Sequence, residues 1–436
     1  MAETVSRALS IEADWERSES KIPEERAGFA AIGISHFDQW LSVAEDGFVK
    51  RVREKVHLSA YSLAEWLAWN WWRLRWEPGR RSAEWAMAHR MTTIGGGYVW
   101  PNITIISDGE RVLLNAQPTK FNVAEPLHYL SNVPAVVRAD EFVSAIDVFI
   151  EQVRGQLEDE KIKESNLESI WTDVLAERKD PEAARTRQLE ALLGFDPEEA
   201  DPKTIKRLLQ DSKDLGEQPI TELAADDPGL SSVQLRELAV EVGAEANPRN
   251  VVKLPPSALS TLSPETAAWR RGAQAASALR KHEHLGDSPI ADAKLCQLLG
   301  VDQKVLKQVK DSPLSFALDA TEKYGRVALR AKGLTGRRFA LARLLGDRLV
   351  SSKNGDFYPA TRAHTYRQKL QRSFAAEFLC PFDAVSNVLK GDFSDESIDE
   401  AAGYFNVSER AVRTLLVNHK VLDRQELDED AQISVA

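Results

Sequence analysis

The chain has 436 residues, enough for two or three domains that each bury a core, and its composition is that of a globular protein, with 43% hydrophobic and 28% charged residues. No apolar run is long enough to cross a bilayer, and the acidic N-terminus lacks the apolar region of a secretory signal, so we expect a cytoplasmic protein with no membrane partner. The formal net charge of −11 argues against nucleic-acid binding over the whole surface.

Residues 1–135 are predicted to form a Trp-rich, mixed α/β domain. A helix is expected around 48–58, and the stretch AEWLAWNWWRLRWEP predicts a second helix in which Trp69, Trp72 and Trp76 share one face. The Trp and Arg side chains between them have two interpretations. They could stack on bases and contact phosphates, or the helix could pack against a sheet while the Arg stems reach solvent.

An extended region follows this helix. The runs ITII and RVLL are joined by SDGE, which predicts a β-hairpin because Asp-Gly tolerates the positive φ of a tight turn. The triple glycine at 95–97 lacks the spacing of a phosphate-binding loop, and Pro101 follows it where a helix would have to begin. We therefore interpret these glycines as a turn that leads into a strand.

Residues 136–246 are predicted to form an acidic, all-helical domain. Apolar residues recur at helical spacing between Phe142 and Val153, and two further helices are expected to be broken at Asp180-Pro181 and at Gly194. The carboxylates of this region have no His or Cys beside them in the sequence. They indicate solvated helix faces rather than an acid/base site.

The remaining boundaries follow from composition. The Pro-, Ser- and Asn-rich residues 247–266 are predicted to be a linker, residues 267–422 the last domain, and the acidic residues 423–436 a disordered tail. The two cysteines, Cys296 and Cys380, each lie in an apolar, helix-like segment, which predicts buried free thiols.

Basic residues are concentrated in one part of the last domain. Residues 322–372 contain thirteen Lys or Arg and three acidic residues, so this segment carries +10 and the remainder of the chain −21. A basic surface can bind phosphates, so DNA or RNA is a candidate partner for this segment. A protein partner could instead dock on the Trp-rich or the acidic helical region.

Two segments of the last domain resemble the active-site helices of a peptidase family. RRFALARLLGDRLV is similar to the RFTLAHELGHLLL helix of the ImmA/IrrE zinc metallopeptidases, and LQRSFAAEFLCP is similar to their EANRFAAELLMP helix. The resemblance covers about residues 260–422 and implies a zincin-like helical domain. The residues that match the family's pattern around its ligands are Arg338, Phe339, Leu341, Ala342, Gly346, Phe374, Ala375, Ala376, Leu379 and Pro381.

The residues that hold and use zinc in this family are all replaced here. Arg343 stands for the first histidine, Leu344 for the general base, Asp347 for the second histidine and Leu370 for the glutamate ligand. An Arg and two Leu cannot ligate zinc, and one carboxylate does not hold a catalytic metal. We expect no metal, no cofactor and no catalytic residue. Arg343 and Asp347, four residues apart on a helix, are expected to pair across the former site.

Two alternatives to a non-catalytic protein stay open. His364 is the only histidine in the loop between the two helices and could approach Asp347. With a further ligand from the N-terminal region, these two residues would make a metal-dependent peptidase with an unusual ligand set. The chain could also be a structural subunit of a larger complex.

The stretch SIDEAAGYFNVSERAVRTLLVNHKVL has the layout of a helix-turn-helix, with a turn through Asn406 and Val407 and a second helix capped by Ser408. This second helix could enter a major groove, or it could pack within the domain as similar helices do in the family that the segment resembles. The candidate nucleic-acid-binding residues of the last domain are Arg337, Arg338, Arg348, Arg362, Arg367, Lys369, Arg372, Arg410, Arg413 and Lys420.

These patterns predict a predominantly helical α+β protein with a mixed N-terminal region, a helical middle domain and an ImmA/IrrE-like C-terminal domain that ends in a helix-turn-helix-like pair. Family members act in bacterial stress, phage-defence and repressor-linked systems, so the resemblance implies a regulatory role. We expect a pseudopeptidase that binds nucleic acid or a protein partner.

Overall fold

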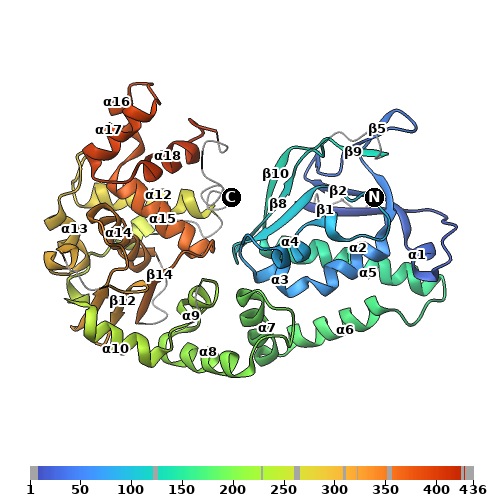
Figure 1. The fold of residues 1–436 in the computed structure, drawn as a ribbon, viewed down its shortest axis with the longest axis horizontal. Helices are drawn as coiled ribbons and strands as arrows, with labels where there is room; N and C mark the ends of the chain where they lie inside the picture. The colour runs from blue at the N-terminus through green and yellow to red at the C-terminus, as the bar shows by residue number, and fades with distance from the viewer. Residues whose placement is uncertain are drawn as a thin grey trace. The chain divides into compact units, whose positions relative to one another are not determined.

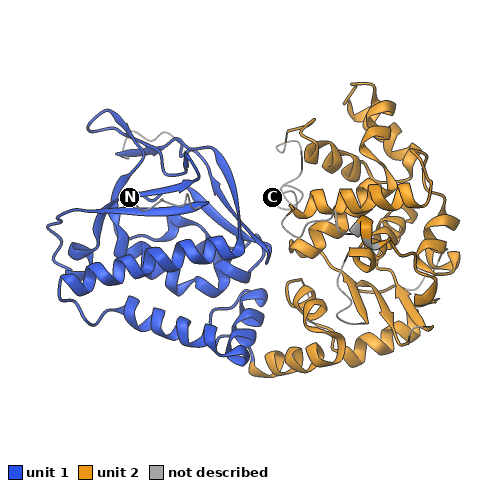
Figure 2. Cartoon of the chain, turned by 180° about the vertical axis from the view of Figure 1, so that it is seen from behind, with its two compact units in different colours: residues 1–201 blue, residues 202–436 orange. Residues whose placement is uncertain are grey.

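The computed structural model describes residues 8–120, 126–226, 229–259, 266–307, 311–321, 323–350, 356–423 and 427. They form a mixed α/β, mostly helical protein with small antiparallel sheets. The chain divides into two compact units, residues 1–201 and 202–436 (Figure 2), and each unit has its own hydrophobic core. Within the described part of the chain, none of the helices has the length and apolar character needed to cross a membrane.

The first unit combines three small sheets with helices (Figure 1). Its strands are β1 (Leu9–Trp15), β2 (Phe29–His36), β3 (Gln39–Trp40), β4 (Ala44–Asp46), β5 (Arg51–Arg53), β6 (Val56–Ser59), β7 (Ile103–Ser107), β8 (Arg111–Ala116), β9 (Leu127–Tyr129) and β10 (Val133–Arg138). Its helices are α1 (Pro23–Ala27), α2 (Ala60–Trp69), α3 (Trp71–Trp76), α4 (Ala83–His89), the 3-10 helix η1 (Met91–Thr93), α5 (Ala139–Asp159), α6 (Asn166–Lys179) and α7 (Pro181–Leu193). The sheets have the orders β1-β2-β3 with β6 also on β2, β10-β8-β7, and β5-β4-β9.

The helix predicted around 48–58 is wrong, because this segment forms β5 and β6. Val56 and Leu58 are buried on β6, and His57 between them is only partly covered. Burial therefore alternates with the period of two that a strand requires rather than with the helical period.

The predicted Trp-rich helix is interrupted. Asn70 separates α2 from α3, so the tryptophans do not share one face. Trp69 is 58% exposed, whereas Trp72 is 4% exposed. Arg73 is buried, and Arg75 donates a hydrogen bond to a backbone carbonyl at 2.7 Å. These basic side chains therefore contribute to the interior of the unit and not to a surface for nucleic acid.

The predicted hairpin is confirmed. Strands β7 and β8 pair antiparallel, and Gly109 in their turn has a φ of +94°. Gly95, Gly96 and Gly97 have φ between 71° and 82° and form part of a turn, as predicted.

The helix boundaries predicted for residues 142–194 are also confirmed. The Asp180 side chain accepts the backbone N–H of Glu182 at 2.9 Å and so caps α7, while Gly194 ends α7 in the left-handed conformation. The predicted acidic domain is divided, however: α5 to α7 belong to the first unit, and the helices after residue 201 belong to the second.

The second unit has one four-stranded sheet of order β11-β13-β12-β14 and is otherwise helical (Figure 1). Its strands are β11 (Ala244–Ala246), β12 (Ser315–Asp319), β13 (Gly325–Ala328) and β14 (Phe357–Ala360). Its helices are α8 (Pro202–Leu215), α9 (Glu217–Ala224), α10 (Ser232–Val242), η2 (Pro248–Asn250), α11 (Pro256–Leu259), α12 (Ala268–His282), α13 (Asp292–Leu299), η3 (Gln303–Lys307), α14 (Leu334–Val350), α15 (Tyr366–Leu379), α16 (Phe382–Leu389), α17 (Asp395–Phe405) and α18 (Glu409–Asn418).

Part of the predicted linker belongs to the second unit. Leu254 is buried, and Val251 and Val252 pack against the core of this unit. Residues 260–265 of that linker lie outside the described residues, as do residues 424–426 and 428–436 of the predicted tail. Cys296 and Cys380 are buried free thiols, as predicted.

The two helices and the turn predicted near the C-terminus are confirmed as local structure. Asn406 has a φ of +54° between α17 and α18, and the Ser408 hydroxyl accepts the N–H of Ala411 at 3.3 Å. Val412 and Leu416 of α18 are fully buried. This helix packs against α15, α16 and α17, so one face of it belongs to the interior of the unit.

Candidate functional site

Helices α14 and α15, which carry the resemblance to a peptidase, pack directly against each other. Gly346 makes this close approach possible, because a Cβ atom at that position would lie 2.5 Å from Cδ1 of Phe374. Thr365 caps α15, and its hydroxyl accepts the backbone N–H of Gln368 at 3.3 Å. The residues that the resemblance aligns with the family's ligands are therefore held on two directly packed helices.

Replacing Gly346 with Ala is expected to destabilise the second unit by about 1–3 kcal/mol, because the added methyl group overlaps the Phe374 ring. Gly403→Ala in α17 is the matched control, since a Cβ at Gly403 meets no atom within 4 Å. That control should gain up to about 1 kcal/mol from the better helix propensity of Ala. Thermal unfolding measures both changes, and equal effects at the two sites would refute the close packing.

Asp347 is fully buried and forms its ion pair with Arg367 of α15. The guanidinium of Arg367 donates to both carboxylate oxygens, at 2.7 and 2.6 Å, which is the bidentate geometry of a strong pair. The partner expected from the sequence was Arg343, so the prediction named the wrong arginine. The four-residue spacing on α14 pointed to Arg343 of the same helix, whereas the actual partner of Asp347 is Arg367 of the neighbouring helix α15.

Arg343 contributes a second set of contacts. Its guanidinium donates to the Thr361 carbonyl at 2.6 Å and to the Gln368 side-chain carbonyl at 2.5 Å, and Gln371 lies further away at 3.4 Å. Both glutamines donate to the carbonyl of Pro359 at 3.1 Å. Burial lowers the pKa of Arg343 to about 10, although the charge of Asp347 acts in the opposite direction.

The two other positions that align with the family's motif, Leu344 and Leu370, are apolar and do not join the polar contacts of Arg343 and Asp347. Leu344 is fully buried in the core of the second unit. Leu370 packs with Ala268 and Tyr366 in a small separate cluster, so it is Gln368 and Gln371, and not Leu370, that face α14. His364 lies half-buried just before α15 begins.

Glu222 of α9 is a buried member of the same polar cluster that sequence analysis missed. Its carboxylate accepts a hydrogen bond from the Thr365 hydroxyl at 2.5 Å. Burial raises the pKa of Glu222, while the charge of Arg367 acts to lower it. The one sequence feature that could have indicated burial of Glu222 is its position between the apolar residues Ile220 and Leu223. Glu222 is more than 100 residues from α14 in the sequence, so its contact with this cluster could not be predicted from local spacing.

The raised pKa of Glu222 predicts a specific pH dependence. The folded state holds a proton on this carboxyl above the pH at which the unfolded chain has lost it, so its contribution to stability falls as pH rises from the unfolded pKa to the folded one. Glu222→Gln removes this dependence while its amide oxygen can still accept from Thr365. We expect the variant to gain stability relative to the parent between pH 5 and pH 8 in urea unfolding. A constant difference across that range would contradict the assignment.

The residues at these positions do not fit a zinc ion. Arg343 and Arg367 are cations, the two glutamines are engaged with Pro359, and the one carboxylate is occupied by Arg367. Throughout the described part of the chain, His, Cys, Asp and Glu side chains nowhere come together in a group of three or more that could hold a metal ion.

Much of the predicted nucleic-acid surface is interior. Arg337 is buried and donates to the carbonyls of Ala331 and Leu306. Arg338 is 1% exposed and pairs with Asp292. The remaining interior members of the predicted set are Arg348, which pairs with Asp319, Arg367, which pairs with Asp347, and the buried Lys369. These residues stabilise the unit, and their positive charge is not available to phosphates.

The other predicted residues are more accessible. The Arg372 guanidinium donates to the Ala363 carbonyl at 2.9 Å, and its Nε atom is buried. Arg362 is largely exposed beside Asp226, and Arg413 pairs with Asp395. Arg410 and Lys420 are exposed. Of the acidic and basic residues counted for this segment, Glu322 and Lys353 lie outside the described residues.

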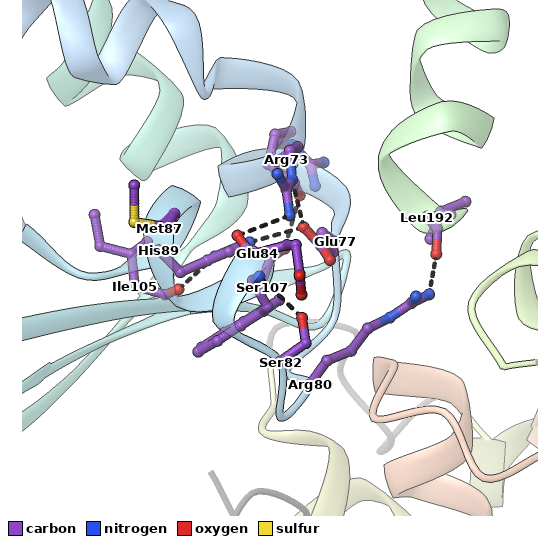
Figure 3. Close-up of polar contacts among 12 residues, drawn as sticks. Arg73, Glu77, Arg80, Ser82, Glu84, Met87, His89, Ile105, Ser107 and Leu192 are labelled. Carbon is purple, nitrogen blue, oxygen red and sulfur yellow. Dashed lines mark hydrogen bonds and ion pairs between the residues drawn. The ribbon is translucent and has the colours of Figure 1, made fainter. Parts of the chain in front are cut away.

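The first unit contains a second buried polar cluster (Figure 3), which the sequence did not predict. Glu77 is 1% exposed and accepts from Nε of Arg73 at 2.8 Å, while its Oε2 atom lies 3.0 Å from Nε2 of His89. Nδ1 of His89 lies 2.8 Å from the Ile105 carbonyl. Both ring nitrogens of His89 therefore face oxygen acceptors. Trp85 stacks on its ring with the centroids 4.4 Å apart.

This cluster has the composition of an acid/base site but the burial of a structural one. Arg73 and His89 share the carboxylate of Glu77. Burial raises the pKa of Glu77, but the hydrogen bonds and charges of His89 and Arg73 outweigh burial and hold the pKa below its usual range. Neither the histidine nor the glutamate is accessible to a substrate, since they are 0% and 1% exposed. We interpret the cluster as a structural one, whose hydrogen bonds hold α3, α4 and β7 together.

Comparison of the chain with protein-family models, curated proteins and solved structures finds no match.

Proposed function

We propose that this chain is a non-catalytic binding protein whose second unit keeps a peptidase-like framework without metal chemistry. One observation carries the proposal: neighbouring residues already engage the charged groups of Arg343 and Asp347, and of these groups only Nε of Arg343 is buried without a hydrogen-bond partner among the described residues. Asp347 is held by Arg367, and Arg343 is held by Thr361 and Gln368. A catalytic zinc site instead needs free nitrogen, sulfur or carboxylate donors and an open position for water.

The arrangement of α14 and α15 supports the resemblance to the ImmA/IrrE family. The family's ligands lie on two helices, and Arg343 and Asp347 of α14 here contact Gln368, Gln371 and Arg367 of α15. Leu370, which aligns with the family's glutamate ligand, does not face α14, so Gln368, Gln371 and Arg367 supply the α15 side of these contacts. A structural ion pair and an amide cluster therefore link the two helices.

A protein partner is favoured over nucleic acid. Five of the ten predicted basic residues are buried or paired inside the second unit, which removes half of the predicted charge that would neutralise phosphates. The first unit exposes apolar side chains near the hairpin of β4 and β5, where Phe48 is 86% and Val52 63% exposed. Neighbouring apolar side chains at a loop tip are typical of a protein-binding surface.

The framework is tested by building a zinc site across the two helices, with the carboxylate at Gln371 because Leu370 does not face α14. The triple variant Arg343→His, Asp347→His and Gln371→Glu places three zinc donors on the facing sides of α14 and α15. We expect this variant to bind one Zn²⁺ per chain in calorimetric titration, while the parent protein binds none. Circular dichroism checks that the variant is folded. A folded variant without zinc affinity would contradict the peptidase-like framework.

The choice between partners is tested by salt dependence. We expect no complex with duplex DNA or hairpin RNA at micromolar protein in 150 mM salt, because the accessible bases are few. A complex that weakens steeply between 50 and 200 mM salt, and that is lost in Arg410→Ala with Lys420→Ala, would instead establish nucleic acid as the partner. Lys304→Ala with Lys307→Ala, two exposed bases of η3, serves as the matched control.

A further inference from the structure

A pocket of about 580 Å³ lies in the second unit, between α12, α15, α16 and the residue that follows α18. Its size falls in the range of sites for small molecules. The residues that define its chemistry are Trp269, Arg270, Glu377, Phe382, Asp383 and His419. Neither the motif positions of α14 nor the predicted basic residues belong to this lining.

Glu377 brings a buried carboxylate to this pocket. The residue is 8% exposed, and its Oε1 atom accepts the backbone N–H of Phe382 at 3.4 Å. Among the described residues, its Oε2 atom is buried and has no hydrogen-bond partner. Nε2 of His419 lies 3.9 Å away, which is too far for a hydrogen bond. A buried acceptor without a donor is costly, so a ligand that supplies an N–H group would relieve this cost.

Aromatic rings form the walls beside Glu377. His419 stacks on Phe382, with ring centroids 3.7 Å apart and an interplanar angle of 2°. Trp269 lies edge-on to His419, with centroids 6.2 Å apart and an angle of 66°. Rings held in fixed mutual positions present faces and edges that favour an apolar body, and a cation is attracted to an aromatic face.

The charges around the pocket favour a cation. Two carboxylates, Glu377 and Asp383, outnumber the one arginine of the lining, Arg270, whose guanidinium lies 5.1 Å from the Trp269 ring centroid and opposes a cation there. Burial raises the pKa of Glu377 to about 7, and the charge of Asp383 acts in the same direction. The Phe382 N–H and the charge of Arg280 oppose this rise. Burial also lowers the pKa of His419, against the opposing charge of Asp383. Above neutral pH the pocket therefore holds an ionised Glu377 and a neutral His419.

We propose that this pocket binds a small organic amine in its ammonium form, with the ammonium donating to Oε2 of Glu377 and its apolar body lying against Trp269 and His419. A concave site of this volume with a carboxylate at its base and aromatic walls matches such a ligand in shape and in charge. The assignment does not depend on the peptidase-like framework, because none of the motif residues takes part.

The direct test is calorimetric titration of the full chain with 2-phenylethylammonium chloride at pH 8. We expect saturable binding with one ligand per chain. Glu377→Gln should weaken it by at least about tenfold, because the substitution removes the charge and turns a donor toward the ammonium. Glu396→Gln, at an exposed glutamate of α17, is the matched control and should leave the affinity unchanged.

Two measurements on the unaltered protein keep the test decisive if Glu377→Gln is unstable. Affinity for the amine should rise about tenfold between pH 6 and pH 8, as Glu377 loses its proton and His419 becomes neutral. The neutral isostere 2-phenylethanol should bind at least about tenfold more weakly than the amine. The proposal is overturned if the amine does not saturate the protein, if the alcohol binds equally well, or if affinity does not change with pH.

Discussion

Replacing Asp347 with Ala is expected to lower the free energy of unfolding of the second unit by about 3–5 kcal/mol. Asp347 is fully buried, and the Arg367 side chain that it binds is 13% exposed. Removing the carboxylate would leave this guanidinium buried and without its bidentate partner. The cost would come mainly from the unpaired charge and not from the lost attraction.

Urea unfolding followed by circular dichroism measures this loss. Asp395→Ala is the matched control, because Asp395 also pairs with an arginine, Arg413, but its side chain is 84% exposed. That control should cost no more than about 1 kcal/mol. Similar losses in the two variants would show that the pair of Asp347 and Arg367 has no special structural role. A double-mutant cycle with Arg367→Met then gives the coupling energy of the pair.

Glu77→Gln is expected to destabilise the first unit by a similar amount, about 3–5 kcal/mol at pH 7. The substitution keeps the volume of the side chain but removes the negative charge that Arg73 and His89 share, and it leaves Arg73 only its more exposed partner Asp196 at 3.2 Å. The substitution also places an amide N–H of the glutamine opposite an N–H of Arg73 or His89, where two donors face each other without an acceptor. Because the three side chains are almost fully buried, water cannot replace the missing acceptor.

The effect of Glu77→Gln should depend on pH in a defined direction. Burial raises the pKa of Glu77, but the hydrogen bonds and charges of His89 and Arg73 outweigh it and hold the pKa below its usual range. The stability that the carboxylate contributes is therefore complete above the unfolded pKa near 4.5 and is lost as pH falls through the lower folded pKa. The difference between parent and variant should be full at pH 7 and should shrink below about pH 4.5.

Unfolding at several pH values measures that difference. Glu45→Gln, at an exposed position of β4, is the control and should change stability by less than about 0.5 kcal/mol. If Glu77→Gln were as mild as this control at pH 7, the cluster would not stabilise the first unit.

Local structure could be predicted wherever a residue has a strong backbone preference. The hairpin turn at Gly109 and the helix breaks at Asp180-Pro181 and at Gly194 depend on neighbours within a few residues, and all three were found as expected. The failures were at 48–58 and at Asn70, where short elements replace one predicted helix. There, tertiary packing overrides an ambiguous apolar pattern.

The candidate site could be located from the sequence but its contacts could not. The sequence directed attention to Arg343 and Asp347 on α14, yet the partner of Asp347 lies on another helix and Glu222 comes from α9. The count of charged residues along the sequence also failed to predict which basic side chains are exposed. Arg338 and Arg348 add to the net charge of their segment, but they are used up in pairs with Asp292 and Asp319.

Zinc titration of the purified parent protein, with Asp347→Ala in parallel, tests most directly the proposal that Arg343, Asp347 and Arg367 form a structural cluster and not a metal site. We expect no stoichiometric zinc in the parent protein, no rise in its melting temperature when zinc is added, and the same destabilisation of Asp347→Ala with or without zinc or a chelator. One equivalent of tightly bound zinc that is lost in Asp347→Ala would contradict this account and would favour a metallopeptidase.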